Sequence, residues 1–259
     1  MMLEGGTLLA FGLYLTRCAA MILSSPPFGT ASGFSGYKVA IVGALALLFY
    51  MSSGVPLPET VGPFEYLLLM MREMTLGVLL GFIVQAIMLA LRVAGEIVGH
   101  GMGLNMAGQV DPVSGVNTPL ITRVYETFYF IGFLAVDGHH WLIRALGSTF
   151  ERAPIGAMGF DRSLADFVRG LFTQMFTAGL SFAAPILVVL ALVSILTGLL
   201  SRAVPQLNVL EVSFTLRVAF ALIAMLLFAP MLAPAMSSLY ETLQDNLEGA
   251  ILALESDDG

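Results

Sequence analysis

Six long apolar segments dominate the sequence and constrain its fold more than any other feature. They cover residues 7–23, 39–55, 66–91, 124–143, 170–200 and 212–233. Each is close to or above the ~20 residues with which a helix crosses the hydrocarbon core of a bilayer, although the second is short. Backbone polar groups in lipid must be satisfied within the segment itself, so runs of this length predict helices. We therefore expect an all-α integral membrane protein.

The composition excludes several classes of protein. Only 11% of the 259 residues are charged and 58% are hydrophobic, whereas a soluble domain carries roughly 25% charged residues. No basic patch accompanies the net charge of -7, so nucleic acid is not an expected ligand. A single cysteine, Cys18, allows neither an intramolecular disulfide nor a cysteine-based zinc site. Glu4 stands where a cleaved signal peptide would be basic, so we expect the N-terminus to be retained.

The negative charge collects at the C-terminal end of the chain. No Lys or Arg follows Arg217, and the acidic residues after it are Glu241, Asp245, Glu248, Glu255, Asp257 and Asp258. We therefore expect a helical body over residues 1–235, followed by an acidic tail over residues 236–259.

The basic residues do not orient the six segments in a membrane. With the N-terminus inside, alternate loops would carry Arg144, Arg152, Arg162 and Arg169 on one side, and Lys38, Arg92, Arg123 and Arg202 on the other. A simple polytopic protein shows a basic excess on its cytoplasmic side. The balance therefore weakens the interpretation as six simple spans.

Four charged residues lie within or near the apolar segments. They are Arg17, Glu73, Asp137 and Arg217, and each would cost about 2.5 to 3.5 kcal/mol at the centre of a bilayer. We expect these charges to be buried against protein rather than to face lipid. The sequence leaves open whether Arg17 and Arg217 pair within the chain or across a subunit interface.

Glycines at four-residue spacing predict close contacts between helices. Gly77 and Gly81 form one such step, and Gly95, Gly99 and Gly103 form two more. Small residues at this spacing line one face of a helix and allow neighbouring backbones to approach. We expect them to serve helix packing or a subunit interface.

The chain holds few residues that suggest chemistry. His139 and His140 follow Asp137 in the motif "DGHH", but positions two apart on a helix do not form the i, i+4 face that zinc-binding helices use. We instead expect Asp137 and Gly138 to end or kink the fourth helix, with the histidines in a polar corner. The sequence shows no nucleophile elbow, phosphate-binding loop or paired carboxylates, so we expect no enzyme, cofactor or metal.

The stretch "GHGMGLNMAGQVDPVSGVNTPL" interrupts the apolar pattern between the third and fourth segments. It is rich in glycine and proline and longer than the usual 2 to 8 residues of a helix connection. Its apolar side chains include Met102, Leu104, Met106 and Val110. Irregular backbone at membrane depth is tolerated where it lines or fills a cavity. The segment is thus either a flexible apolar seal that moves aside or an ordinary exposed loop.

Several motifs resemble those of a known family. The stretches "GEIVGHGMGLNMAGQVDPVSGVNTPLI", "FYFIGFLAVDGHHWLI" and "LTGLLSRAVPQLNVLEVSF", with "SSPPFG" near the start, resemble successive motifs of the FliR/SctT family. These are the R-type subunits of flagellar and virulence type III secretion export gates. The resemblance runs over residues 8–234. It implies a single export-gate domain over residues 1–259 in the bacterial inner membrane, within a flagellar basal body or an injectisome base.

The resemblance also implies partners and an architecture. One copy of an R-type chain assembles with five P-type and four Q-type subunits, alongside a B-type switch subunit, and unfolded export substrates pass transiently. Its helical hairpins resemble a fusion of a P-type and a Q-type subunit, packed in a helical assembly. We favour the flagellar system over the injectisome. The alternative from another class is a stand-alone transporter of a small solute or ion, with Asp137 and the histidines as its polar site.

The resemblance assigns site residues as well. The family's plug loop corresponds to residues 103–117, with Asn105, Met106, Val110, Asp111, Pro112, Val113 and Gly115 as the matching positions. Family members often have an aromatic residue where this chain has "NMAGQ", so Met106 and its neighbours would take over the sealing contacts. The "SRAVPQLNV" motif implies a packing or subunit contact through Arg202, Pro205, Gln206 and Asn208.

Overall fold

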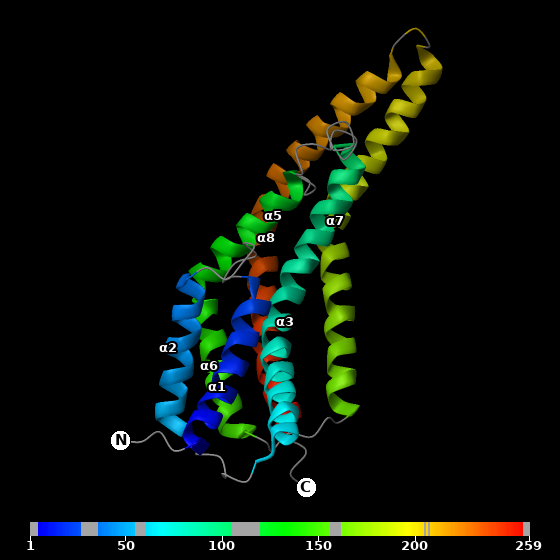
Figure 1. Cartoon of the computed structure of the whole chain (residues 1–259). Helices are drawn as coiled ribbons and strands as arrows, with labels where there is room; N and C mark the ends of the chain where they lie inside the picture. Colours follow the sequence, from blue (N-terminus) through cyan, green and yellow to red (C-terminus); the bar gives the residue numbers. More distant parts are fainter. Residues whose placement is uncertain are drawn as a thin grey trace. The chain divides into compact units, whose positions relative to one another are not determined.

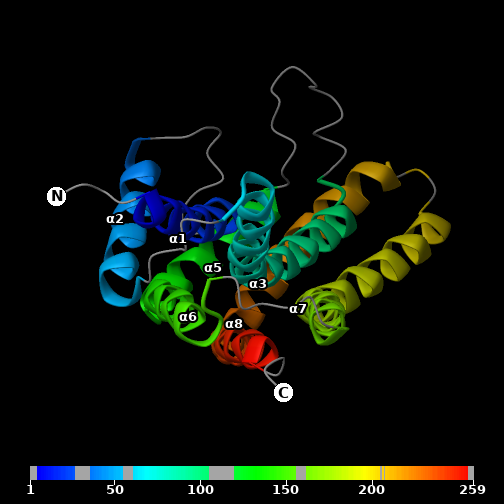
Figure 2. The ribbon, with the colours of Figure 1, turned by 60° about the horizontal axis from the view of Figure 1, so that its bottom comes forward.

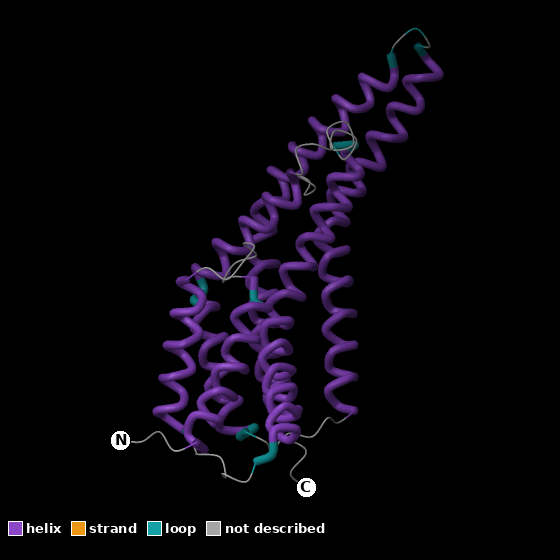
Figure 3. The backbone as a smooth tube through the Cα atoms, viewed as in Figure 1, coloured by secondary structure: helices purple, strands orange, loops and turns teal. Residues whose placement is uncertain are grey.

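The computed structural model describes residues 5–26, 36–54, 61–104, 120–155, 162–204, 206 and 208–255, where short turns join α-helices. The helices are α1 (Gly5–Ser24), α2 (Gly36–Ser53), α3 (Pro63–Met102), α5 (Leu120–Ala135), α6 (Gly138–Arg152), α7 (Arg162–Ala203) and α8 (Val209–Glu255). Figures 1 and 3 show these helices, and no strand occurs in the described ranges. The all-α prediction is confirmed.

Within the described residues, five helical stretches, rather than six, are long and apolar enough to cross a membrane. They are Gly6–Ser24, Gly36–Ser53, Pro63–Met102, Asp166–Ala203 and Glu211–Phe228. The predicted fourth span at residues 124–143 is divided between α5 and α6. The interruption lies at Asp137, whose backbone is left-handed with φ of 56°, a conformation that ends a right-handed helix. The prediction that this segment would form one span was wrong, and the predicted break at Asp137 and Gly138 is confirmed.

The C-terminal part of α8 is an amphipathic helix where we expected an acidic tail. Tyr240, Leu243, Leu247 and Ala250 are each buried to at least 96%, at the spacing of one helix face. The acidic side chains of this stretch lie on the exposed face: they are Glu241, Asp245 and Glu248. The acidic residues that suggested a tail occupy only the exposed face of this helix. The apolar residues on the opposite face recur with helical periodicity, which explains why the segment folds as a helix.

The chain divides into two compact units. The first comprises Met1–Ala86, Leu134–Leu171 and Glu241–Gly259, and the second comprises Ile87–Phe133 and Phe172–Tyr240. Three long helices, α3, α7 and α8, contribute residues to both units.

The core of the first unit is built around α1. This helix packs against α2 and against the N-terminal half of α3, and α2 also contacts α6 (Figure 2). Aromatic side chains join the helices: the ring of Tyr14 stacks on that of Phe150 at 4.5 Å between centroids, and Phe49 lies 5.3 Å from Phe150. The Tyr14 hydroxyl donates to the Ser53 carbonyl at 3.0 Å.

The second unit packs the C-terminal half of α3 against α5 and α7, and α5 against α8. A Cβ atom placed on Gly95 would meet the backbone of Thr122 at 2.6 Å, and one on Gly179 would meet the Ala90 carbonyl oxygen at 2.7 Å. The helices therefore approach at backbone distance at these two points. Between α5 and α8, the Tyr240 hydroxyl donates to the Tyr129 carbonyl at 2.8 Å.

Candidate functional site

A buried ion pair lies at the centre of the first unit. Arg17 on α1 is fully buried, and Glu73 on α3 is 2% exposed. The Arg17 Nε donates to Glu73 Oε2 at 2.6 Å, and Nη2 lies 2.5 Å from the same oxygen. These two predicted buried charges neutralise each other within the chain.

The same guanidinium caps the C-terminal end of α6. Nη1 of Arg17 donates to the carbonyl and the hydroxyl of Thr149 at 2.9 and 3.2 Å, and Nη2 donates to the Ala153 carbonyl at 3.0 Å. The guanidinium carbon also lies 4.4 Å from the centre of the Phe150 ring. With the two contacts to Glu73, the five N–H groups of the guanidinium are matched by five contacts to oxygen. A cation at this position also complements the negative end of the helix dipole.

This arrangement answers the question that the sequence left open for Arg17. Its hydrogen-bonding capacity is used inside the first unit, so Arg17 does not need a group from another subunit. No local pattern in the sequence indicates its contacts to α6, because Thr149 lies 132 residues away along the chain.

The other two predicted buried charges differ from Arg17 and Glu73. Asp137 is not buried: its side chain is 69% exposed, because the left-handed turn between α5 and α6 directs it outward. Arg217 on α8 is half-buried, and its Nε atom is buried without a hydrogen-bond partner among the described residues.

The α5–α6 turn brings the "DGHH" residues together. The rings of His139 and His140 are 4.2 Å apart between centroids, and His140 Nδ1 lies 3.4 Å from Asp137 Oδ1. One ligand atom from each of the three residues lies within 4.8 Å of the others. The expectation that no metal site forms here rested on helical spacing, whereas the left-handed backbone of Asp137 places its carboxylate beside His140. His100, the third histidine, lies exposed on α3.

The predicted glycine face of α3 meets different neighbours along its length. Cβ atoms on Gly77 and Gly81 would collide with α1, at Ala20 and Ser24 among others, whereas Gly95 lies against Thr122 of α5. Gly99 is buried. Gly77, Gly81 and Gly95 therefore serve packing within the two units.

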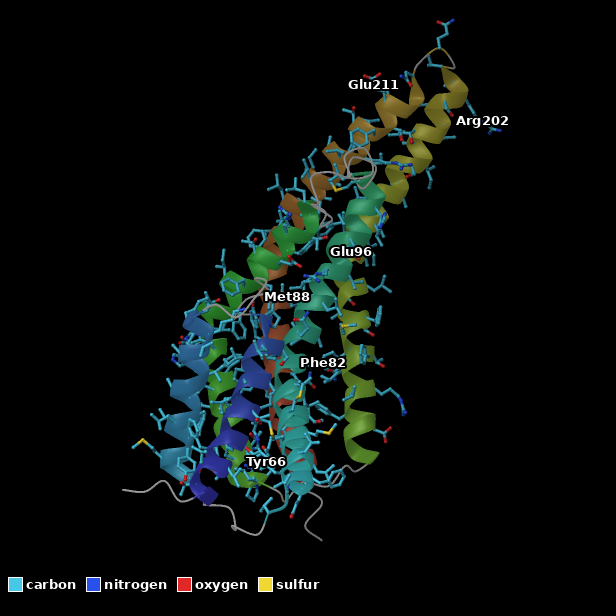
Figure 4. All side chains as sticks on the ribbon, in the orientation of Figure 1. Tyr66, Phe82, Met88, Glu96, Arg202 and Glu211 are labelled. Atoms are coloured by element: carbon cyan, nitrogen blue, oxygen red, sulfur yellow. The ribbon has the colours of Figure 1, made fainter. Side chains whose placement is uncertain are left out.

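The "SRAVPQLNV" motif joins α7 to α8. Arg202, Gln206 and Asn208 are exposed, and Pro205 lies outside the described residues. Asn208 is the N-cap of α8: its carbonyl accepts from the Val212 amide at 3.1 Å, and its side-chain amide donates to Glu211 at 3.3 Å. Figure 4 shows Arg202 and Glu211 beside this connection.

The predicted plug residues lie outside the described residues, but the point where α3 ends is described. The backbone of Gly103 is left-handed, with φ of 81°. The Leu104 amide donates to the Gly99 carbonyl at 3.2 Å, and the Gly103 amide donates to the His100 carbonyl at 3.0 Å. These two hydrogen bonds form a Schellman motif, which ends a helix abruptly. The helix therefore stops where the resemblance places the start of the loop.

Comparison with known proteins identifies the family. A family model described as "Bacterial export proteins, family 1" matches residues 8–243. The chain belongs to this family. It is 30% identical to the flagellar biosynthetic protein FliR of Escherichia coli (strain K12) over 241 residues, which cover 93% of this chain and 92% of the relative. It is 29% identical to FliR of Bacillus subtilis (strain 168), over 84% of this chain and 85% of the relative.

The chain is also similar to a protein that is not named FliR. The surface presentation of antigens protein SpaR of Shigella sonnei is 24% identical over 185 residues, which cover 71% of each chain. Together these relatives confirm the resemblance to the FliR/SctT family. The chain is thus an all-α membrane subunit of a type III protein export apparatus, and family membership sets aside the stand-alone transporter.

Sequence reasoning missed a second ion pair of this export protein. Arg92 on α3 donates through Nε to Glu126 on α5 at 2.7 Å, and the side chains are 36% and 19% exposed. Glu96 and His100 follow Arg92 at four-residue spacing, on the same face of α3, and both are exposed. Figure 4 shows Glu96 on this part of α3. No local pattern relates Arg92 to a partner 34 residues away.

The last two helices of the export protein carry large exposed apolar faces. On α7, Leu192, Ile195 and Leu199 are each at least 60% exposed, and on α8 Leu226 and Leu227 are 76% and 71% exposed. An aqueous surface does not tolerate a continuous apolar face of this kind. Lipid or other subunits must therefore cover it.

Proposed function

We propose that this chain is the single-copy, channel-forming R-type subunit of a flagellar type III export gate in the bacterial inner membrane. In this proposal it assembles with P-type and Q-type subunits and a B-type switch subunit, and unfolded export substrates pass through the assembly. The observation that carries the proposal is the family match over residues 8–243, together with relatives named as flagellar biosynthetic proteins over most of both chains.

The exposed apolar faces support a role in an assembly. The spans on α7 and α8 present Ile195 and Leu226 at 63% and 76% exposure, without apolar cover from the described part of the chain. Arg217 lies within the α8 span, and its Nε lacks a partner among the described residues. A neighbouring helix that carries an acceptor for Arg217 would both cover the apolar face and satisfy this cation.

The anchoring of the loop at residues 103–117 supports its role as a plug. Before the loop, α3 ends at the Schellman motif of Gly103. After it, α5 begins at Leu120, and Thr122 on this helix packs against Gly95 at backbone distance. Both ends of the loop are therefore attached to one packed helix pair within the second unit. A loop held at its base in this way can close a channel without losing its position when it opens.

Deletion of residues 107–115 tests the plug. We expect the variant to assemble with its partners but to let ions and small molecules through the closed gate, measured as conductance of the purified complex in planar bilayers. Native mass spectrometry of the co-expressed complex should show one copy of this chain in both variant and wild type. Asp166→Asn, at an exposed site on α7, is the control. An assembled deletion variant that is as tight as wild type would refute the plug, and a monomer or homodimer would refute the assembly.

A second candidate is the equivalent subunit of a virulence injectisome, because the chain is also similar to SpaR. Complementation distinguishes the two systems. We expect the chain to restore motility to a strain that lacks FliR more effectively than it restores secretion to a strain that lacks SpaR. The reverse result would assign the chain to an injectisome.

A further inference from the structure

We propose that Asp137, His139 and His140 form a binding site for a divalent transition metal ion of the zinc class at the α5–α6 turn. The three residues offer ligand atoms that all lie within 4.8 Å of one another. All three belong to the first unit. The site is separate from the features that carry the proposed function, and its test does not depend on that function.

The backbone of the turn creates this convergence. Asp137 is the residue before α6, yet its side chain makes no capping hydrogen bond to the helix, which is the usual role of aspartate at this position. Its Oδ1 instead lies 3.4 Å from His140 Nδ1. The Asp137 carbonyl accepts from the His140 amide at 2.8 Å, so the turn itself is held in place. The carboxylate is therefore free of the helix and directed to the histidines.

His139 supplies the second observation. Its Nδ1 atom is buried and has no hydrogen-bond partner among the described residues. A buried polar atom without a partner requires an explanation. The hydrogen-bonding capacity of the His139 imidazole is therefore not fully used by the described residues, and its ring lies 4.2 Å from that of His140 between centroids.

The donor set selects the class of ion. Two imidazole nitrogens and one carboxylate oxygen suit zinc, cobalt, nickel and copper, whereas magnesium and calcium prefer ligand sets made only of oxygen. Bonds of about 2.1 Å in tetrahedral geometry place ligand atoms roughly 3.4 Å apart. Asp137 and His140 are 69% and 58% exposed, so both side chains are free to close the remaining distance and an ion reaches them from solvent. Three protein ligands leave a fourth position for water.

The single tryptophan of the chain provides a direct readout. Trp141 follows His140, and Co²⁺ or Ni²⁺ bound at the turn should quench its fluorescence. We expect the full-length chain, purified in detergent through a tag without histidines, to show saturable quenching by Co²⁺ at one ion per chain. Zn²⁺ should reverse the quenching by competition. Mg²⁺ should neither quench nor compete.

Variants separate this site from the rest of the chain. His139→Ala and His140→Ala should each weaken Co²⁺ binding at least tenfold, whereas His100→Ala, which removes the histidine outside the cluster, should leave it unchanged. Asp137→Gly removes a ligand but retains a residue that favours the left-handed backbone. This variant should therefore fold as well as wild type and still bind at least tenfold more weakly. The absence of saturable binding in wild type, or binding that depends on His100 instead, would overturn the proposal.

Discussion

The ion pair between Arg17 and Glu73 allows a sharp test of what holds the first unit together. Glu73→Leu keeps a side chain of similar size and removes its charge. Arg17 would then remain fully buried with its positive charge unbalanced. Removal of one partner of a buried pair costs about 3–5 kcal/mol, and we expect a loss of that size in the free energy of unfolding. Arg17→Met should cost a similar amount, because it leaves the carboxylate of Glu73 buried alone.

The double variant Arg17→Met with Glu73→Leu should be less damaging than either single change. Replacement of both charges by apolar groups removes the unbalanced charge. It does not restore the donor to the Ala153 carbonyl, which Arg17 Nη2 serves at 3.0 Å. That unsatisfied acceptor should leave a cost of about 1–3 kcal/mol. The sum of the single effects should therefore exceed the effect of the double variant by at least about 3 kcal/mol.

Denaturant titration of the detergent-solubilised chain measures these differences, with the fluorescence of Trp141 on α6 as the signal. Asp166→Asn is the control, because Asp166 and Arg169 form a pair whose side chains are 70% and 77% exposed. It should change the free energy of unfolding by less than about 0.5 kcal/mol. Additive effects of the two single variants would refute the reasoning, since they would show that Arg17 and Glu73 do not act as a pair.

Three further predictions concern the packing of individual helices. Gly77→Ala should destabilise the chain by about 1–3 kcal/mol through overpacking against α1. Gly43→Ala, with open space around it, should instead stabilise α2 by about 0.5–1 kcal/mol. Equal effects of the two variants in denaturant titration would contradict the close approach of α3 to α1 at Gly77. Tyr240→Phe should cost about 0.5–1.5 kcal/mol by removing the hydrogen bond to Tyr129. Burial raises the pKa of Tyr240, so the unfolded chain loses this proton at a lower pH than the folded chain. The stabilisation by the Tyr240 hydroxyl should therefore decline as the pH rises above about 10, and Tyr240→Phe should lack this part of the pH dependence. Asn208→Ala should change the free energy of unfolding by at most about 0.5 kcal/mol, because its side chain donates only to exposed Glu211 among the described residues and its capping carbonyl is retained; a loss near 1 kcal/mol would contradict this.

The helical class and most of the spans were predictable from the sequence because both follow from local composition. A run of apolar residues in lipid has to be helical, wherever it lies in the fold. The break at Asp137 was also predictable, since Asp followed by Gly favours a turn. The convergence of Asp137 with the two histidines was not, because it depends on a left-handed backbone that no spacing rule contains.

The pairing of charges required the structure. Arg17 contacts Glu73 at a separation of 56 residues and Thr149 at a separation of 132, and only the packing of α1 on α3 and α6 brings them together. The sequence showed that Arg17 and Glu73 needed partners, but it did not show that each is the other's partner. The C-terminal helix was missed for a different reason: the apolar period of Leu243, Leu247 and Ala250 was present in the sequence, and the acidic residues between them obscured it.

The apolar faces of α7 and α8 also bear on how a cell can make this protein. A newly synthesised copy exposes Leu199, Ile223 and Leu227 at 58% or more and so cannot wait in the cytosol. It must enter the membrane during translation and then find its neighbours in the plane of the bilayer. Copies that fail to do so would leave Arg217, whose Nε lacks a hydrogen-bond partner among the described residues, without an acceptor in lipid, at a cost of about 2.5 to 3.5 kcal/mol. The stability of a single copy should therefore depend on the neighbour that supplies this acceptor.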